Sequence, residues 1–284
     1  DRPETLALTG GYRRIPVMQI GSDIYADTAL ILDELDRRFP ERSLIPVIDS
    51  RRQPGVDFAL RLWTDRVFFP LLPWTQLPRA LHADREKMSN RKIPLDPSHP
   101  SYTLSRAAAR ESLAQIEAHL AHAEPTGWIL PGPNPTSADV HLAMNVWFLL
   151  FVAGQSWVRS EFPRVVAWVT RLHERAGMEF GAATGGIEMG AEDAVEVAMV
   201  GESCVRTGEA HGEVMGAGTG GVRVGDVVDV APSDYGRDAT RGTVVRIDAD
   251  RVVVRRRDDH VGVTTTVHFP RSGYVVRKAR IAKL

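Results

Sequence analysis

A pair of residues near the N-terminus has the chemistry to bind a small charged ligand. Asp27 and Thr28 directly precede apolar residues at helical spacing, so we expect them to begin a helix. The first turn of a helix offers free N–H groups to a carboxylate, and the Asp27 side chain could meet an ammonium group. A helix cap without a ligand is the plainer interpretation, but a cap and a ligand site are compatible.

The sequence around this pair resembles the glutathione-binding half of the glutathione transferase family. Residues 12–17 read Tyr-Arg-Arg-Ile-Pro-Val, and residues 21–28 read Gly-Ser-Asp-Ile-Tyr-Ala-Asp-Thr. In that family a strand opens with a cis-proline, a hairpin follows, and an acidic residue and a hydroxyl residue begin the next helix.

The resemblance implies a binding site for glutathione as co-substrate. A cis bond between Ile15 and Pro16 would turn the Ile15 backbone outward, where a ligand peptide could pair with it like an added strand. Asp27 and Thr28 would bind the γ-glutamyl amine and carboxylate, and Arg14 would give weaker assistance. Taken alone, the proline is better explained as a trans-proline at the start of a strand.

A second motif supports the resemblance. Thr136 and Asp139 form a Thr-x-x-Asp capping box before an apolar helix. It is similar to the capping box before the central helix of the family's all-helical domain. Two motifs in the right order are more specific than either one, and the resemblance covers residues 1 to about 180.

The resemblance is incomplete at its start. The family's N-terminal domain begins with a strand, a helix and a second strand, which need roughly 60 residues, whereas only 15 residues precede Pro16. The family's activating Ser, Tyr or Cys lies in that first part, so we assign no catalytic residue. We expect an upstream segment to be missing from the sequence, since without it the strand at 15–20 has a bare edge. Enzymatic activity is expected only if that segment is present.

Periodicity predicts an α+β protein. Strands are expected at 15–20 and from 24, and helices at 28–39, 55–69, 102–123, 138–152, 162–175 and 191–200. Five alternating segments follow at 222–230, 242–247, 251–257, 261–269 and 274–279, which suggest a small closed barrel. The predicted domains are a partial thioredoxin-like domain (1–45), an all-helical domain (46–180), a Gly-rich linker (181–221) and a small β-barrel (222–284). The last looks like an appendage of a fungal-type subgroup of the family.

Composition and charge limit the class of protein. The chain has 35 basic and 36 acidic residues, but residues 222–284 alone carry 13 basic and 8 acidic ones. A nucleic-acid-binding tail is therefore an alternative, although Asp258 and Asp259 follow the Arg255–Arg257 run and no aromatic residues alternate with it. The sequence has no apolar stretch long enough to span a membrane. The lone Cys204, which we treat as inert, fits a cytoplasmic protein.

Two further groups of residues have a functional and a plainer interpretation. His119 and His122 share a helix face, but no third ligand is evident, so we predict no metal site. Four aromatic residues could line a pocket for an electrophilic substrate, although at helical spacing such residues more often form core: Trp63, Phe68, Phe69 and Trp74.

These observations favour a glutathione transferase-like protein. The expected chemistry is attack of the glutathione thiolate on an electrophilic apolar small molecule, with conjugation, isomerisation, reduction and lyase cleavage all open. The resemblance also implies a homodimer. The alternatives are a non-catalytic binding or scaffold protein with the same fold, and a nucleic-acid-binding module in the tail.

Overall fold

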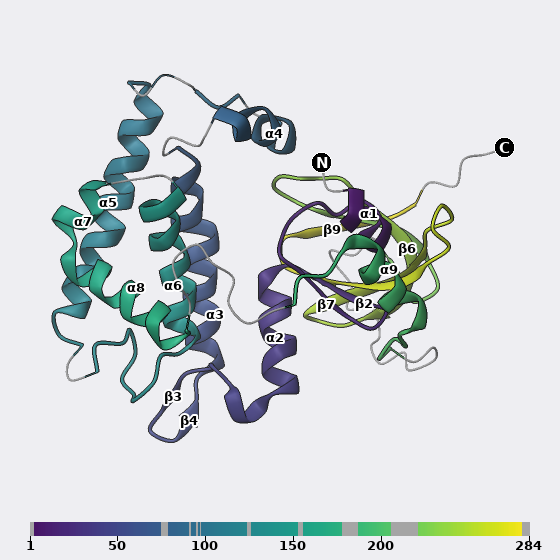
Figure 1. Cartoon of the computed structure of the whole chain (residues 1–284), viewed down its shortest axis with the longest axis horizontal. Helices are drawn as coiled ribbons and strands as arrows, with labels where there is room; N and C mark the ends of the chain where they lie inside the picture. The colour runs from purple at the N-terminus through teal and green to yellow at the C-terminus, as the bar shows by residue number, and fades with distance from the viewer. Residues whose placement is uncertain are drawn as a thin grey trace. The chain divides into compact units, whose positions relative to one another are not determined.

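The computed structural model of the chain describes residues 3–74, 79–90, 92–94, 96, 98–123, 126–152, 156–177, 187–205 and 221–279. It forms two compact units (Figure 1). The first, here called the sheet unit, comprises residues 1–38, 88–90 and 187–284. The second, the helical unit, comprises residues 39–87 and 91–186. The predicted α+β class is confirmed.

The sheet unit is built on one seven-stranded sheet that joins the N-terminal hairpin to the C-terminal strands. The order across the sheet is β1 (Val17–Ile20), β2 (Asp23–Ala26), β8 (Thr264–Pro270), β7 (Arg251–Arg257), β6 (Thr240–Ile247), β5 (Val227–Pro232) and β9 (Tyr274–Lys278). Strands β2 and β8 run parallel, and all other neighbours in this sheet are antiparallel. β1 and β9 lie at the two ends of the order, so the sheet is open.

The prediction of a small closed barrel at 222–284 is wrong. The five C-terminal strands form near their predicted positions, but β8 pairs with β2 of the N-terminal hairpin instead of closing on its own set. Alternation of apolar and polar residues predicts that a segment is a strand, but it does not specify which free edge the strand will meet. The division of the chain into four separately folding segments stays a prediction.

The two faces of the sheet are covered by different helices. On one face, Ile24 and Phe269 pack with the helices α1 (Pro3–Thr9) and α9 (Ala191–Val200), which lie side by side in Figure 1. On the other face, Tyr25 packs against α2 (Thr28–Arg38). Because side chains alternate along a strand, Asp23 and Tyr25 lie on the α2 face. α9 has the predicted bounds, while residues 181–186 and 206–220 of the predicted linker lie outside the described residues.

The helical unit confirms the predicted all-helical domain. Its helices pack around a common core with buried Leu113, Val146 and Trp168. The elements are η1 (Pro40–Arg42), the short hairpin β3 (Val47–Ile48) and β4 (Arg51–Arg52), α3 (Pro54–Trp63), η2 (Thr64–Phe68), η3 (Phe69–Trp74), α5 (Pro100–Leu120), α6 (Ser137–Trp147), η4 (Phe148–Val152), α7 (Ser156–Glu161) and α8 (Pro163–Arg175). The chain also forms α4 (Arg79–Ser89). Among the described residues, no helix has the length and apolarity needed to cross a membrane.

The predicted capping box at the start of α6 is present and its aspartate is fully buried. Asp139 Oδ2 accepts the Thr136 N–H at 2.9 Å, which satisfies a backbone donor at the helix start. Asp139 Oδ1 accepts the Ile129 N–H and the Trp168 indole N–H, both at 2.9 Å. The Asp139 side chain thus joins the N-terminus of α6 to α8 and to the loop that precedes α6.

Candidate functional site

The hairpin brings the predicted glutathione-binding residues together at one end of β1 and β2. The ladder pairs Val17 with Ala26, so Pro16 and Asp27 are the next residues beyond it on the two strands. The Ile15–Pro16 peptide bond is cis, as the resemblance implies. Pro16 is exposed, and Ile15 is 61% exposed. Both residues at this end of β1 are therefore exposed to solvent.

Asp27 caps α2 in an uncommon backbone conformation. Its Oδ1 accepts the Ala29 N–H and its carbonyl oxygen accepts the Ile31 N–H, both at 3.0 Å. Its φ of +78° lies in the left-handed region, which non-glycine residues adopt mainly at sites with a structural or functional constraint. Among the described residues, the N–H groups of Thr28 and Leu30 have no partner. Thr28 is exposed whereas Leu30 is buried, so the Thr28 N–H is the free donor on an exposed residue at the start of α2.

A tyrosine of the C-terminal strands lies at this site. The Tyr274 hydroxyl, at the start of β9, is 3.1 Å from Asp27 Oδ2 and 3.1 Å from the Tyr12 hydroxyl. Tyr12 is almost fully buried beneath it. Sequence reasoning missed Tyr274 because it placed residues 222–284 in a separate barrel.

The fifth predicted site residue, Arg14, is also held by the C-terminal segment. Its Nε donates to the carbonyl oxygen of Tyr235 at 3.1 Å, and its Nη2 donates to the same oxygen and to the Asp234 carboxylate. Its guanidinium lies 3.9 Å from the centre of the Tyr235 ring, in a cation–π contact. These contacts fix Arg14 beside the site.

The four aromatic residues proposed for a substrate pocket have different environments in the helical unit. Phe68 is fully buried and belongs to the core. Trp63 and Phe69 are partly buried and pack against that core, with 5.5 Å between the Trp63 and Phe68 ring centres. The side chain of Trp74 lies outside the described part of the chain. Of the four residues, Trp63 and Phe69 are the ones whose described surface remains partly open.

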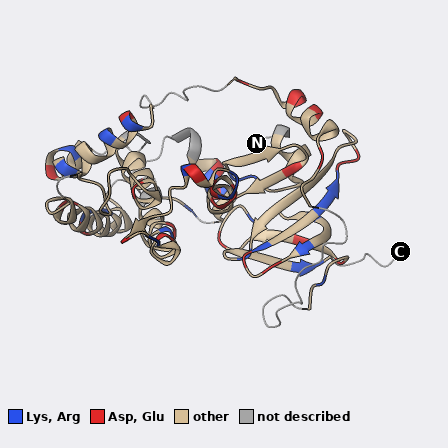
Figure 2. Cartoon of the chain, turned by 90° about the horizontal axis from the view of Figure 1, so that it is seen from below, with Lys and Arg blue, Asp and Glu red and all other residues tan. Residues whose placement is uncertain are grey.

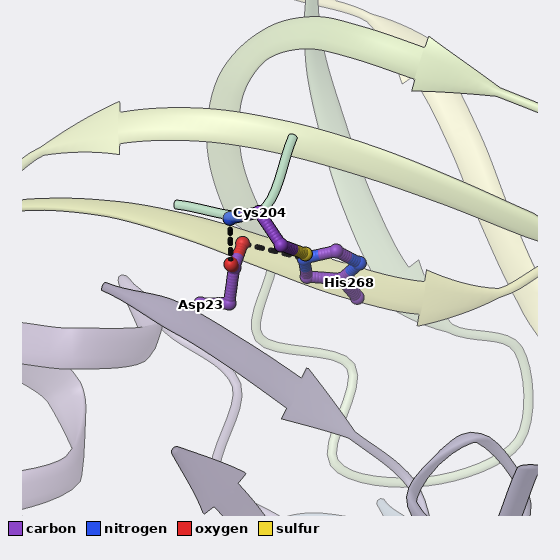
Figure 3. Close-up of side chains that lie close together, drawn as sticks. All are labelled: Asp23, Cys204 and His268. Carbon is purple, nitrogen blue, oxygen red and sulfur yellow. Dashed lines mark hydrogen bonds and ion pairs between the residues drawn. The ribbon is translucent and has the colours of Figure 1, made fainter. Parts of the chain in front are cut away.

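A second cluster of polar side chains lies on the α2 face of the sheet (Figure 3). The carboxylate of Asp23 accepts hydrogen bonds from the Ser203 hydroxyl at 2.8 Å, from the Cys204 N–H at 2.6 Å and from His268 Nε2 at 2.8 Å. Asp23 and His268 are 1% and 2% exposed, and Tyr25 stacks on the imidazole. No local pattern indicates this cluster, because its members come from three segments that are distant in the sequence.

The geometry of this cluster favours a structural role over a catalytic one. In a Cys–His–Asp triad, a histidine ring nitrogen that faces the thiol acts as the base. Nε2 of His268 is instead hydrogen-bonded to Asp23, and Nδ1 is buried with no partner among the residues that the structure describes. Desolvation of the thiol raises the pKa of Cys204, and the Asp23 carboxylate acts in the same direction. A metal ion bound through Nε2 would move the ring proton to Nδ1, where it would have no acceptor.

Asp23 is therefore expected to hold the hairpin, the segment after α9 and β8 together. Replacing Asp23 by asparagine should destabilise the sheet unit by about 2 kcal/mol, since an amide cannot accept all three hydrogen bonds. Burial alone would raise the pKa of Asp23, but the hydrogen bonds from His268 and the Cys204 N–H outweigh it and lower the pKa. The ionised form thus stabilises the fold above about pH 4, and this contribution is lost as the pH falls through the lowered pKa.

Hydrogen exchange of the β2 and β8 amides measures this effect. Opening free energies of the wild type and the Asp23→Asn variant should differ clearly at pH 6 and converge at low pH. An equal difference at both pH values would contradict the role of the ionised carboxylate.

The basic run in the tail is engaged in local contacts. Arg256 donates to the Ala7 carbonyl and to Asp258, Arg257 lies 3.5 Å from Asp259, and Arg255 donates to the Val205 carbonyl. Figure 2 shows acidic segments among the basic ones on the strands of the sheet unit. These contacts favour a solvated, ion-paired sheet over a surface that binds phosphates.

Comparison with known proteins finds similar sequences and folds. The family model for the C-terminal domain of glutathione S-transferases matches residues 99–171. A solved GST-like protein from Pseudomonas syringae has 26% sequence identity and a TM-score of 0.71, covering 98% of this chain and 86% of that one. A glutathione S-transferase from Rhodospirillum rubrum F11 has 19% identity and a TM-score of 0.46, covering 61% and 71% of the two chains. One from Methylobacterium radiotolerans, in complex with glutathione sulfonate, has 17% identity and a TM-score of 0.44, covering 64% and 80%. Comparison with curated protein sequences finds no match.

Residues 99–171 thus match the glutathione S-transferase C-terminal domain, and the fold of the chain is similar to that of the Pseudomonas syringae GST-like protein. The domain match lies in the helical unit. The structural likeness extends over almost the whole chain, so the C-terminal strands are part of the fold that the two proteins share.

Proposed function

We propose that this chain binds glutathione at the hairpin end formed by Ile15, Pro16, Asp27 and Thr28. The observation that carries the proposal is the position of Asp27 beside Pro16, with free N–H donors at the start of α2. The donors suit the γ-glutamyl carboxylate, the Asp27 carboxylate suits the ammonium group, and the exposed Ile15 backbone suits the peptide. Glutathione carries all three groups in one molecule.

The chemistry that we propose is addition of the glutathione thiol to an electrophilic apolar molecule. The thiol gives up its proton, its sulfur forms a bond to the electrophilic carbon, and any leaving group departs with the electron pair. Trp63 and Phe69 of the helical unit are the residues that we propose for contact with the electrophile. The residue that lowers the thiol pKa is not assigned to this chain.

A homodimer and a cytoplasmic location also belong to the proposal, on the strength of the family resemblance and of the single cysteine. The competing function is a binding or scaffold protein that holds glutathione without turning it over.

Affinity chromatography tests the proposal. The chain should be retained on immobilised glutathione and released by free glutathione, and the full-length protein should consume glutathione with a general electrophile such as an activated aryl halide. Retention without turnover would favour the binding protein. If immobilised glutathione does not retain the chain, or free glutathione does not release it, the proposed site would be contradicted.

A further inference from the structure

We propose that the C-terminal strands supply a positioning residue of the glutathione site: the Tyr274 hydroxyl orients the Asp27 carboxylate toward the ammonium group of the ligand. This inference rests on the proposed function. It gives the C-terminal segment a role in ligand binding. The alternative is that this segment is an appendage with no effect on the site.

The direction of the hydrogen bonds follows from the groups involved. The Tyr274 hydroxyl has one hydrogen and two neighbours at 3.1 Å, Asp27 Oδ2 and the Tyr12 hydroxyl. An ionised carboxylate can only accept, so Tyr274 donates to Asp27 and Tyr12 donates to Tyr274. Burial raises the pKa of both tyrosines far above their usual value, which keeps both hydroxyls protonated. The series of hydrogen bonds from Tyr12 through Tyr274 ends on the Asp27 carboxylate, and each hydrogen bond strengthens the next.

The two oxygens of Asp27 are then fixed by different parts of the fold. Oδ1 accepts the Ala29 N–H of α2, and Oδ2 accepts the Tyr274 hydroxyl of β9. Each carboxylate oxygen has a further lone pair, so the group can still accept from an ammonium ion. A carboxylate held at both oxygens loses little conformational freedom when the ligand binds, which favours affinity.

Arg14 provides independent support for this role of the C-terminal segment. Its guanidinium is held by the Asp234 carboxylate and by the carbonyl and ring of Tyr235. Two of the five residues predicted for the glutathione site, Arg14 and Asp27, are thus positioned by residues 234–274. This arrangement requires the C-terminal strands to be in place for the site to have its observed geometry.

The plainer interpretation is that Tyr274 serves only to pack the sheet unit. Its ring lies 5.6 Å from the Phe269 ring and 6.2 Å from the Tyr12 ring, centre to centre. Substitution by phenylalanine keeps these contacts and removes only the hydroxyl. It therefore separates the packing role from the positioning role.

The experiment measures binding of two ligands to the whole chain by calorimetry. The ligands are glutathione and its analogue without the α-amino group, and the proteins are the wild type, Tyr274→Phe and, as a matched control, Tyr102→Phe, whose hydroxyl bonds the Pro94 carbonyl in the helical unit. Tyr274→Phe should raise the Kd for glutathione about tenfold, equivalent to about 1.4 kcal/mol. Its Kd for the analogue should stay within about twofold of the wild type, because the lost interaction acts through the ammonium group. Tyr102→Phe should bind both ligands as the wild type does.

Three outcomes would overturn the inference, and they differ in what they leave standing. Equal glutathione affinity of the wild type and Tyr274→Phe would remove the role of Tyr274 and leave the proposed function intact. An equal loss for both ligands would assign Tyr274 a structural role only. Failure of the wild type to bind glutathione would overturn the proposed function, and this inference with it.

Discussion

Replacing Asp139 by asparagine is expected to lower the free energy of unfolding of the helical unit by about 3–5 kcal/mol. The Asp139 carboxylate is fully buried and accepts hydrogen bonds from three N–H donors, on Thr136, Ile129 and Trp168. An asparagine amide would turn an NH2 group toward at least one of these donors. The unmet hydrogen bonds would remain buried, where water cannot replace them.

Tryptophan fluorescence in a denaturant titration is a specific readout for this variant. All six tryptophans fall within the residues of the helical unit, so their emission reports on that unit. Glu111→Gln, on the exposed side of α5, is the control and should change stability by less than about 0.5 kcal/mol. If Asp139→Asn had the same denaturation midpoint as the control, the buried carboxylate would not be needed for the stability of the helical unit.

Replacing Asp27 by asparagine is expected to weaken glutathione binding about a hundredfold, equivalent to roughly 3 kcal/mol. Asparagine tolerates the positive φ of this position, and its Oδ1 can still accept the Ala29 N–H, so α2 keeps its cap. The negative charge that we propose to bind the ligand ammonium group is lost. The amide NH2 that replaces Oδ2 cannot accept the Tyr274 hydroxyl, so a smaller loss of stability, about 1 kcal/mol, should accompany the loss of affinity.

The control for Asp27→Asn removes the same charge elsewhere in the sheet unit. Asp259, with a side chain 91% exposed, is suitable, and Asp259→Asn should bind glutathione as the wild type does. Asp259→Asn should keep the thermal midpoint of the wild type within about 1 °C, and Asp27→Asn should remain folded with a midpoint lowered by about 2–4 °C. If Asp27→Asn bound glutathione as tightly as the wild type does, Asp27 would not be part of the binding site.

Local patterns in the sequence predicted the elements well. The apolar spacing of residues 191–200 and the alternation at 251–257 predicted α9 and β7 at their observed bounds, because both signals depend on residues close in the chain. The cis-proline and the Thr136 capping box were found for the same reason, as short motifs. The sequence patterns did not predict α1, α4 or the β3–β4 hairpin, because these elements are short or weakly patterned.

Contacts between distant segments could not be predicted in the same way. The pairing of β2 with β8 depends on which strand edges are free once the chain has folded, and no periodicity encodes it. The same pairing brings His268 to Asp23, and the position of β9 brings Tyr274 to Asp27. Half of the candidate site was therefore predictable, namely the half that lies in residues 14–28. The other half appears only in the folded sheet.

Calorimetric titration of the chain with glutathione tests whether the hairpin end at Pro16 and Asp27 binds this ligand. We expect saturable binding at one site per chain, weakened about a hundredfold by Asp27→Asn and unchanged by Asp259→Asn. Absence of saturable heat up to millimolar glutathione, from a chain whose unfolding remains cooperative, would contradict it.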